Sequence, residues 1–291
     1  MTEFRTIGLV SRVSNDQIRE SLLAVVPLLV NRDIQVLADE VASGMLGEAG
    51  CKRASWDEMG QECDLLIAVG GDGNILSAAR AMAPHGVPIL GINRGKLGFL
   101  ADVSPDQIDD QLNSVLAGDY TTEEHFLLEG LVEGHDEAPS ALNEVLVHSA
   151  SMPKMIEMEL YVDGKFVYTQ NSDGLIVSSP TGSTAYALSA GGPIMHPSLD
   201  AIVLVPMFPH SLTSRPLVVP GNGEIRVVIG SETDVEAKVS FDSHLEFRIK
   251  PGDSLVIRKK RELLQLIHPP GHSFYEVCRS KLDWASRNKN R

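Results

Sequence analysis

A short glycine-rich segment stands where a strand pattern gives way to a helical one. The apolar run at 64–68 is typical of a buried strand, Val69-Gly70-Gly71-Asp72-Gly73-Asn74 follows it, and helical spacing begins at residue 75. Glycines at such a turn let the backbone approach a ligand, and the first N–H groups of a helix favour an anion such as phosphate. An acidic side chain among these amides indicates a site that also accepts a proton or organises a metal ion. The ordinary alternative is a tight turn in which Asp72 bonds to its own backbone.

Chain length and charge limit the classes of protein to consider. A chain of 291 residues is long enough for two domains. Its formal net charge of −14 argues against a nucleic-acid-binding protein, which needs a basic face. The apolar run at 22–30 is too short to cross a bilayer, so no membrane partner is expected.

The three cysteines and the first residues suggest where the protein works. Cys51, Cys63 and Cys278 are scattered and odd in number, with neither metal-ligand nor disulfide spacing. The strand pattern at 6–10 begins with no signal peptide ahead of it. Reduced thiols and a cytoplasmic protein are therefore expected.

The patterns divide the chain near residue 120. Residues 1–122 alternate strands and helices, which predicts an α/β nucleotide-binding domain with a parallel sheet. Its expected strands are 7–10, 34–37, 64–68 and 87–92, and its expected helices are 16–29, 75–83 and 105–117. The last helix has Ser104 as a predicted N-cap with Gln107 completing a capping box, and Gly118 as its left-handed C-terminal residue.

Strand patterns dominate residues 123–272 and predict an all-β domain. Expected strands lie at 126–132, 143–147, 158–162, 166–169, 175–178, 202–205, 225–229, 235–241, 255–258 and 263–267. Asp163-Gly164 is a two-residue hairpin signal, and one helical insertion is expected at 184–190. Residues 273–291 form a C-terminal tail with a possible helix at 275–284, and the basic end, 287–291, is expected to be solvated.

A second segment of small and hydroxyl residues follows the expected strand 175–178. It runs from Ser178 to Pro193 and contains Thr181-Gly182-Ser183-Thr184-Ala185-Tyr186. Hydroxyls and amides at a helix start suit ribose and phosphate oxygens, whereas the alternative is a capped helix ended by Gly191-Gly192-Pro193. The P-loop and Rossmann fingerprints are both missing from the sequence.

Several motifs in one order resemble the bacterial NAD kinases (the ATP-NAD kinase family) over roughly 7–268. They are Gly70 to Asn74, Gly91 to Leu100 (Gly-Ile-Asn-Arg-Gly-Lys-Leu-Gly-Phe-Leu), Asn143-Glu144, Asp173-Gly174 and Thr181 to Tyr186. The resemblance implies transfer of the γ-phosphate of ATP to the 2′-hydroxyl of the adenosine ribose of NAD. It also implies an N-terminal Rossmann-like α/β domain, a C-terminal β-sandwich that binds NAD, and an active site between them. Relatives need a divalent cation (Mg²⁺ or Mn²⁺) and form homo-oligomers, dimers or tetramers.

The resemblance assigns roles residue by residue. Asp72 matches the catalytic carboxylate that takes the proton from the 2′-hydroxyl, and Gly73 leaves room for the nucleotide. Asn143 and Glu144 match the pair that bonds the adenosine portion of NAD, and Asp173 a carboxylate toward its nicotinamide end. The remaining nucleotide-binding assignments are Lys154, Asn171, Thr181, Thr184, Ala185, Tyr186, Ala187, Leu188, Ser189 and His244. The resemblance names no protein ligand for a metal.

Other interpretations stay open for some of these residues. Asn143-Glu144 could be an ordinary polar pair on a strand, and Lys154 and His244 could be surface residues. Arg94 and Lys96 are candidates for ATP phosphate contacts or for an inter-domain ion pair. Relatives often have glycine where Ser243 follows Asp242, and a charged or imidazole side chain where Asn171 stands.

Two other functions remain as alternatives to the NAD kinase. The first is a related Gly-Gly-Asp-Gly kinase acting on a lipid such as diacylglycerol or a sphingoid base. The second is an NADP-binding sensor that has lost catalysis. The Thr181 to Tyr186 motif favours a dinucleotide over a lipid, and the presence of Asp72 argues against the sensor. The sequence leaves open the preference for ATP over polyphosphate, the preference for NAD over NADH, and regulation by NADP or NADPH.

Overall fold

The computed structural model describes residues 4–47, 50–94, 98–151, 154–231 and 235–284, which form two compact units. Unit 1 comprises 1–124 and 264–291, and unit 2 comprises 125–263. The expected division placed 123–272 in the second domain, whereas by packing the chain returns to unit 1 at Leu264. Lys96 and the basic end, 287–291, lie outside the described residues.

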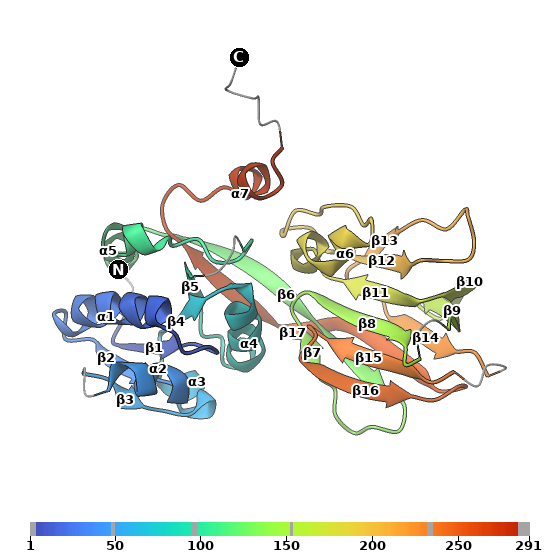
Figure 1. Ribbon diagram of the computed structural model, residues 1–291, viewed down its shortest axis with the longest axis horizontal. Helices are drawn as coiled ribbons and strands as arrows, with labels where there is room; N and C mark the ends of the chain where they lie inside the picture. The colour runs from blue at the N-terminus through green and yellow to red at the C-terminus, as the bar shows by residue number, and fades with distance from the viewer. Residues whose placement is uncertain (1–3, 48–49, 95–97, 152–153, 232–234, 285–291) are drawn as a thin grey trace, which may run out of the picture. The chain divides into compact units, whose positions relative to one another are not determined.

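Unit 1 is built on a parallel sheet with strand order β17-β5-β4-β1-β2-β3 (Figure 1). Its strands are β1 (Thr6–Val10), β2 (Gln35–Ala38), β3 (Lys52–Arg53), β4 (Leu65–Gly70), β5 (Ile89–Asn93) and the end of β17 (Ser254–His268). Its helices are α1 (Asp16–Val30), α2 (Glu40–Leu46), α3 (Trp56–Glu62), α4 (Asp72–Met82), α5 (Ile108–Leu116) and α7 (Phe274–Lys281), with short 3₁₀ turns at η1 (Ala83–His85) and η2 (Pro105–Gln107). The expected α/β domain with a parallel sheet is confirmed.

The core of unit 1 follows from the helical spacing of apolar residues. Leu22, Val26 and Leu29 lie on one face of α1 and are buried with Ile7 and Leu9 of β1. The helix α5, which packs against α1, adds its own stripe to the same core. The sheet therefore presents the carboxyl ends of β4 and β5 at one edge, where ligands of α/β folds bind.

The start of the last helix of the α/β region differs from the prediction. Ser104 and Pro105 open the turn η2 instead of α5, and the Ser104 hydroxyl donates to Gln107 Oε1 at 2.9 Å, so no side-chain cap bond forms. The capping-box prediction is therefore wrong at this position. Gly118 has a φ of 87°, as its predicted C-terminal role requires.

Unit 2 consists of two antiparallel layers that share one core (Figure 1). One layer has the order β13-β12-β11-β8-β15-β16, and the other contains β10-β9-β14-β17 with β6 and β7 beside β17. The strands are β6 (Thr121–Val132), β7 (Ser140–Ala141), β8 (Glu144–Ser149), β9 (Ile156–Val162), β10 (Lys165–Ser172), β11 (Gly174–Ser178), β12 (Ala201–Met207), β13 (Leu217–Pro220), β14 (Ile225–Ile229), β15 (Ala237–Phe241) and β16 (Leu245–Ile249). This arrangement is the expected sandwich.

Turn residues in unit 2 account for its hairpins. Asp163 and Gly164 join β9 to β10 with φ values of 51° and 72°, as the hairpin prediction requires. Asp242 and Ser243 join β15 to β16 and are also left-handed, with φ values of 48° and 53°. A left-handed position favours glycine, which gives a physical reason for the glycine that relatives often have in place of Ser243.

The strand β17 corrects the expectation of two separate strands at its place. Residues 259–262 (Lys-Lys-Arg-Glu) are polar and look like a break in the sequence, yet the strand runs unbroken from Ser254 to His268. Its first part pairs with β14 and its last part with β5. The chain passes between the units within β17 and β6.

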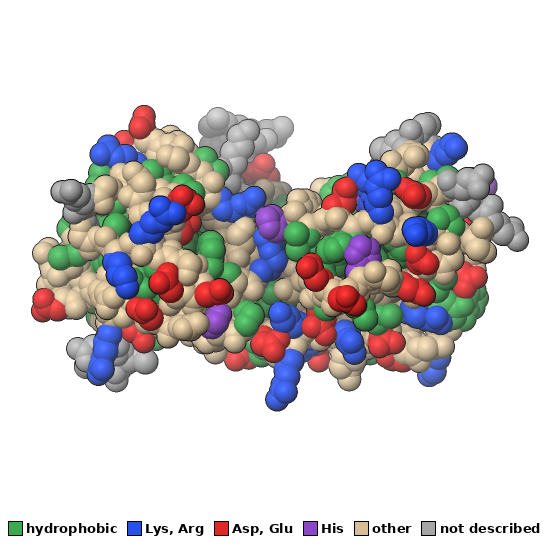
Figure 2. All heavy atoms as spheres, turned by 90° about the horizontal axis from the view of Figure 1, so that it is seen from below, with side chains coloured by type: hydrophobic (Ala, Val, Ile, Leu, Met, Phe, Trp, Pro, Cys, Tyr) green, Lys and Arg blue, Asp and Glu red, His purple; other side chains and the backbone are tan. Residues whose placement is uncertain are grey.

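Charges are spread over the surface of both units. On the face shown in Figure 2, acidic and basic side chains of the described residues are interspersed and form no continuous basic patch. Within the described ranges, none of the helices combines the length and hydropathy needed to cross a bilayer.

Candidate active site

Asp72 is the first residue of α4, directly after the carboxyl end of β4. Gly71 is the N-cap residue and has an extended backbone. Because glycine has no side chain, no side-chain hydrogen bond caps the helix. The Asp72 carboxylate accepts two backbone hydrogen bonds, from Phe99 N at 2.7 Å and from Leu100 N at 3.2 Å. The alternative in which Asp72 bonds only to its own turn is therefore wrong, because its partners are 27 and 28 residues away.

Burial raises the pKa of Asp72 above its ordinary value, and this effect exceeds the opposing influence of the Phe99 and Leu100 amides. A carboxylate with a raised pKa is a better proton acceptor for an alcohol than a solvated one. The ammonium group of Lys281, on α7, also acts electrostatically on Asp72. Sequence reasoning missed Lys281 because it lies 209 positions after Asp72 in the chain.

Glycine at position 70 is required by its conformation and by its neighbour. Gly70 has a φ of 149°, and a Cβ there would lie 1.9 Å from Asn74 Nδ2. The buried Asn74 donates to Val69 O and accepts from Arg12 N at 3.1 Å, which ties the ends of β1 and β4 together. Gly73 is more open, because a Cβ there would meet Arg12 Nη1 at 3.5 Å.

Arg94 follows β5 and lines an open cavity of about 450 Å³ within unit 1. Its guanidinium contacts α1, with Nε donating to Ser21 Oγ and Nη2 lying 3.6 Å from Glu20 Oε2. The ion pair that forms is therefore inside unit 1.

The described residues do not provide a preformed magnesium cage at Asp72. The groups of three His, Cys, Asp or Glu ligand atoms in the described part of the chain do not include this carboxylate. Mg²⁺ is commonly bound by one or two carboxylates together with substrate phosphates. A single carboxylate beside a helix N-terminus fits a metal ion that arrives with a nucleotide.

In unit 2, the carboxylate of Asp242 holds the segment that carries Asn143 and Glu144. Its Oδ2 accepts from Leu142 N at 2.9 Å, and its Oδ1 accepts from Asn143 N at 2.8 Å and from Glu144 N at 3.3 Å. Asp242 is itself buried. Sequence reasoning noticed Asp242 only through its neighbour and missed this positioning role.

Glu144 is a buried carboxylate with unused bonding capacity. Glu144 is the first residue of β8, and its side chain is buried. Its Oε2 has no hydrogen-bond partner among the described residues. Burial and then repulsion from Asp242 raise the pKa of Glu144 to about 8, against a smaller opposing effect of the Tyr186 amide. A buried polar atom without a partner is costly, so this oxygen is suited to a ligand hydroxyl or amino group.

The second glycine-rich segment wraps around the backbone of Asn143. A Cβ at Gly182 would lie 2.1 Å from Asn143 O, and Ser179 N donates to the same oxygen at 2.9 Å. The Ser183 hydroxyl donates to Pro180 O and accepts from Met195 N at 2.9 Å. The Ser179 hydroxyl likewise donates to Leu142 O, so these two hydroxyls of the segment bond within the protein, whereas the ligand-binding prediction for the rest of the segment stays a prediction.

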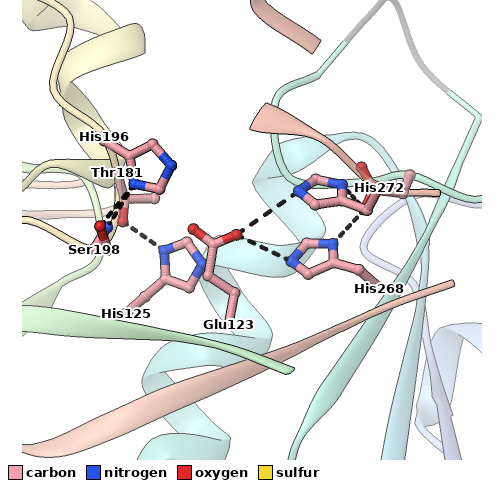
Figure 3. A network of polar contacts seen from close by, with 8 residues as sticks. Glu123, His125, Thr181, His196, Ser198, His268 and His272 are labelled. Carbon is pink, nitrogen blue, oxygen red and sulfur yellow. Dashed lines mark hydrogen bonds and ion pairs between the residues drawn. The ribbon is translucent and has the colours of Figure 1, made fainter. Parts of the chain in front are cut away.

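The residues from Thr181 to Ser189 have different exposures. Thr181 and Thr184 lie in a 3₁₀ turn, η3 (Thr181–Thr184), and Thr181 Oγ1 lies 2.8 Å from His125 Nδ1 (Figure 3). A short helix, α6 (Tyr186–Ser189), follows and begins without a side-chain cap. Tyr186 and Ser189 are exposed and Ala185 and Leu188 are partly exposed, whereas the Ala187 side chain is wholly buried. Ala187 is therefore not positioned to offer its methyl group to a ligand.

Asp173 lies at the other end of its sheet from Glu144, whereas His244 follows Asp242, which bonds the backbone of Glu144. Asp173 directly precedes β11 and lies five residues from Ser178, which pairs with Glu144 at the start of β8, so the two are roughly 16 Å apart at about 3.3 Å per residue. Asn171 is exposed near Asp173, and its carbonyl accepts from His210 N at 2.9 Å. Lys154 and His244 are exposed. A ligand that touches both Glu144 and Asp173 must be extended.

Sequence reasoning also missed a cluster of histidines and carboxylates in unit 1. His268 ends β17, His272 precedes α7, and both rings direct a nitrogen toward Glu123 of β6 (Figure 3). Both Nδ1 atoms contact Asp102 Oδ2 on their other side, at 2.8 Å for His272. Burial lowers the pKa of His272, but hydrogen bonds to Asp102 and Glu123 outweigh it and raise the value to about 9. Only the signal His-Pro-Pro-Gly-His at 268–272 is visible in the sequence.

Comparison with known proteins identifies the family. The model of the ATP-NAD kinase N-terminal domain matches residues 7–120, and that of the ATP-NAD kinase C-terminal domain matches residues 142–269. The NAD kinase of Teredinibacter turnerae is 51% identical over 293 residues, covering 100% of both chains. The NAD kinase of Azotobacter vinelandii is 50% identical over 290 residues, covering 99% of this chain and 98% of the relative.

Two solved structures have the same fold. The yeast NADH kinase complexed with NADH has a TM-score of 0.89 at 22% identity, covering 100% of this chain and 91% of the other. An NAD kinase from Archaeoglobus fulgidus in complex with ATP has a TM-score of 0.75 at 25% identity, covering 96% and 97%. Together with the family match, an α/β unit with a Gly-Gly-Asp-Gly turn and an antiparallel β unit place the chain among two-domain kinases. More particularly, the chain belongs to the ATP-NAD kinase family.

Proposed function

We propose that this protein is an NAD kinase that transfers the γ-phosphate of ATP to the 2′-hydroxyl of the adenosine ribose of NAD. The observation that carries the proposal is the Asp72 carboxylate, partly buried at the start of α4 within the region that matches the family model. As the 2′-oxygen attacks the γ-phosphorus, the bond to the β,γ-bridging oxygen breaks. Asp72 accepts the hydroxyl proton, and ADP and NADP are formed.

The orphaned Glu144 Oε2 supports a nucleoside as the acceptor. A ribose hydroxyl or an adenine amino group would donate to this oxygen and satisfy it. Asn143 is held beside it by Asp242 and supplies an amide. The remaining proposed NAD contacts are Gly73, Lys154, Asn171, Asp173, Thr181, Thr184, Ala185, Tyr186, Leu188, Ser189 and His244, with Ala187 contributing through its backbone.

Metal, assembly and location complete the proposal. A divalent cation, Mg²⁺ or Mn²⁺, would neutralise charge on the ATP phosphates, and Asp72 is the carboxylate near which it would lie. We propose a homo-oligomer, which light scattering would measure, working in NADP biosynthesis in the cytoplasm. The free thiols of Cys51, Cys63 and Cys278 support that location.

Replacing Asp72 with Asn tests the proposed role directly. We expect Asp72→Asn to lower turnover by about 10²-fold or more, in an assay of NADP formed from ATP, Mg²⁺ and NAD, while NAD still binds. Asp106→Asn, an exposed aspartate of η2, is the matched control and should keep wild-type turnover. Unchanged turnover in Asp72→Asn would remove Asp72 from the base role. Phosphorylation of diacylglycerol in place of NAD would favour the lipid kinase.

A further inference from the structure

The histidine–carboxylate cluster of unit 1 has no part in the proposed phosphoryl transfer. It comprises Asp102, His268 and His272. Glu123 lies at the edge of the two histidine rings, as Figure 3 shows. Asp102 and His268 are 166 positions apart, so the fold brings together residues that have no motif in common. Imidazole and carboxylate are the ligands that zinc and neighbouring divalent transition metals prefer.

The ligand atoms converge on one point. The Nδ1 atoms of His268 and His272 both face Asp102 Oδ2, and the ligand atoms of all three residues lie within 4.8 Å of one another. The two rings are stacked with centroids 3.8 Å apart and an interplanar angle of 17°. Two tetrahedral ligands at the usual zinc bond lengths are about 3.3 Å apart. To admit the ion, the 2.8 Å contact between His272 Nδ1 and Asp102 Oδ2 would open by about half an ångström, and the shorter contact between His268 Nδ1 and Asp102 Oδ2 would open further.

Glu123 occupies the position of a supporting carboxylate. Its Oε2 lies 3.6 Å from His268 Nε2 and 3.7 Å from His272 Nε2, on the opposite edge of each ring from Asp102. Histidines that bind a metal through one nitrogen usually direct the other N–H to a carboxylate, which fixes the ring and strengthens the ligand. His268 Nε2 is buried and makes no hydrogen bond within the described residues, so a small approach of Glu123 would satisfy it.

The cluster also has an entry path and room for a further ligand. Asp102 lines the cavity of about 450 Å³ that Arg94 and Lys281 also line. Three protein ligands with a fourth position open to water form a familiar zinc coordination. The His268 side chain is buried, whereas the side chains of Asp102 and His272 are partly accessible.

We propose that Asp102, His268 and His272 bind one zinc ion, or a neighbouring divalent transition metal, with Glu123 orienting the two imidazoles. The ion would join the segment after β5 to the segment that precedes α7. Phe99 and Leu100, whose amides hold Asp72, lie just ahead of Asp102 in the first of these segments. The site is separate from the cation that accompanies ATP, and its existence does not depend on the kinase activity.

Zinc binding by the whole, untagged protein tests this proposal. After removal of metal with a chelator and then of the chelator, titration calorimetry with zinc chloride should give one equivalent per chain. His272→Ala should weaken binding at least about 100-fold, and Glu123→Gln by about 10- to 100-fold. His210→Ala, an exposed histidine of unit 2, is the matched control and should bind zinc like the wild type. Cobalt(II) should give visible d–d bands that His272→Ala abolishes.

Two results would overturn the proposal. One is the absence of stoichiometric zinc binding by the wild-type protein. The other is zinc binding by His272→Ala and Glu123→Gln that equals binding by His210→Ala. If circular dichroism shows that His272→Ala does not fold, Glu123→Gln alone decides, because glutamine keeps the shape of the side chain and removes its charge.

Discussion

Glu144 makes the stability of unit 2 depend on pH in a direction that can be calculated. Its pKa is 4.5 in the unfolded chain and about 8 in the folded protein, because burial and Asp242 disfavour its ionised form. A raised pKa stabilises the fold fully below pH 4.5, and this contribution is lost as pH rises through 8. Glutamine at position 144 remains neutral, so Glu144→Gln removes this loss.

The size of the effect follows from the two pKa values. At 1.36 kcal/mol per pKa unit, the ionisation of Glu144 costs the fold ~4 kcal/mol at pH 8 and ~1 kcal/mol at pH 5. The stability of Glu144→Gln relative to the wild type should therefore increase by ~3 kcal/mol between these pH values. Titrating groups that do not interact with Glu144 contribute equally to both proteins and cancel in the difference.

Urea unfolding followed by circular dichroism at pH 5 and pH 8 measures this difference. Glu129→Gln is a useful control, because Glu129 lies on β6 of the same unit and pairs with Arg258 at a more exposed position. The reasoning is refuted if the difference between Glu144→Gln and the wild type is the same at both pH values. Above pH 8, where Glu144 is ionised, NAD affinity should fall in Glu144→Gln, because an amide accepts a ligand hydrogen bond more weakly than a carboxylate.

Three further substitutions test other parts of the structure. Gly98→Ala places a Cβ 1.9 Å from Asp72 Oδ1, so we expect the carboxylate to move and turnover to fall while circular dichroism stays unchanged; wild-type turnover would contradict this. Gly182→Ala meets the rigid Asn143 carbonyl at 2.1 Å, and should lower the free energy of unfolding by about 1–3 kcal/mol and weaken NAD binding. Leu22→Ala removes most of a fully buried side chain of α1 and should lower the free energy of unfolding by about 2–5 kcal/mol. A urea midpoint equal to that of the wild type would contradict this.

The fold could be predicted where one local period dominates. The stripe of α1 and the turn at Asp163-Gly164 carry their signals within a few residues, and the structure agrees with both. The helices α2 and α3 were missed although Asp39 and Ser55 cap them, because seven-residue helices hold too few apolar positions to show a period.

The candidate site could be predicted only in part. Asp72 and Glu144 stand in local motifs, but their surroundings come from distant segments. The amides of Phe99 and Leu100 reach Asp72, and Asp242 holds Asn143 across 99 positions. The zinc ligands show the same limitation, since long-range packing brings Asp102 to His268 and no spacing rule contains it.

Because β17 belongs to the sheets of both units, the order in which the chain is synthesised affects unit 1. Unit 1 lacks the strand beside β5 until Leu266 and Ile267 have been made, although its other parallel strands lie within the first 93 residues. An emerging N-terminal unit therefore carries an open sheet edge while all of residues 125–263 are translated. A gene truncated at residue 124 would encode an incomplete sheet with a tendency to aggregate.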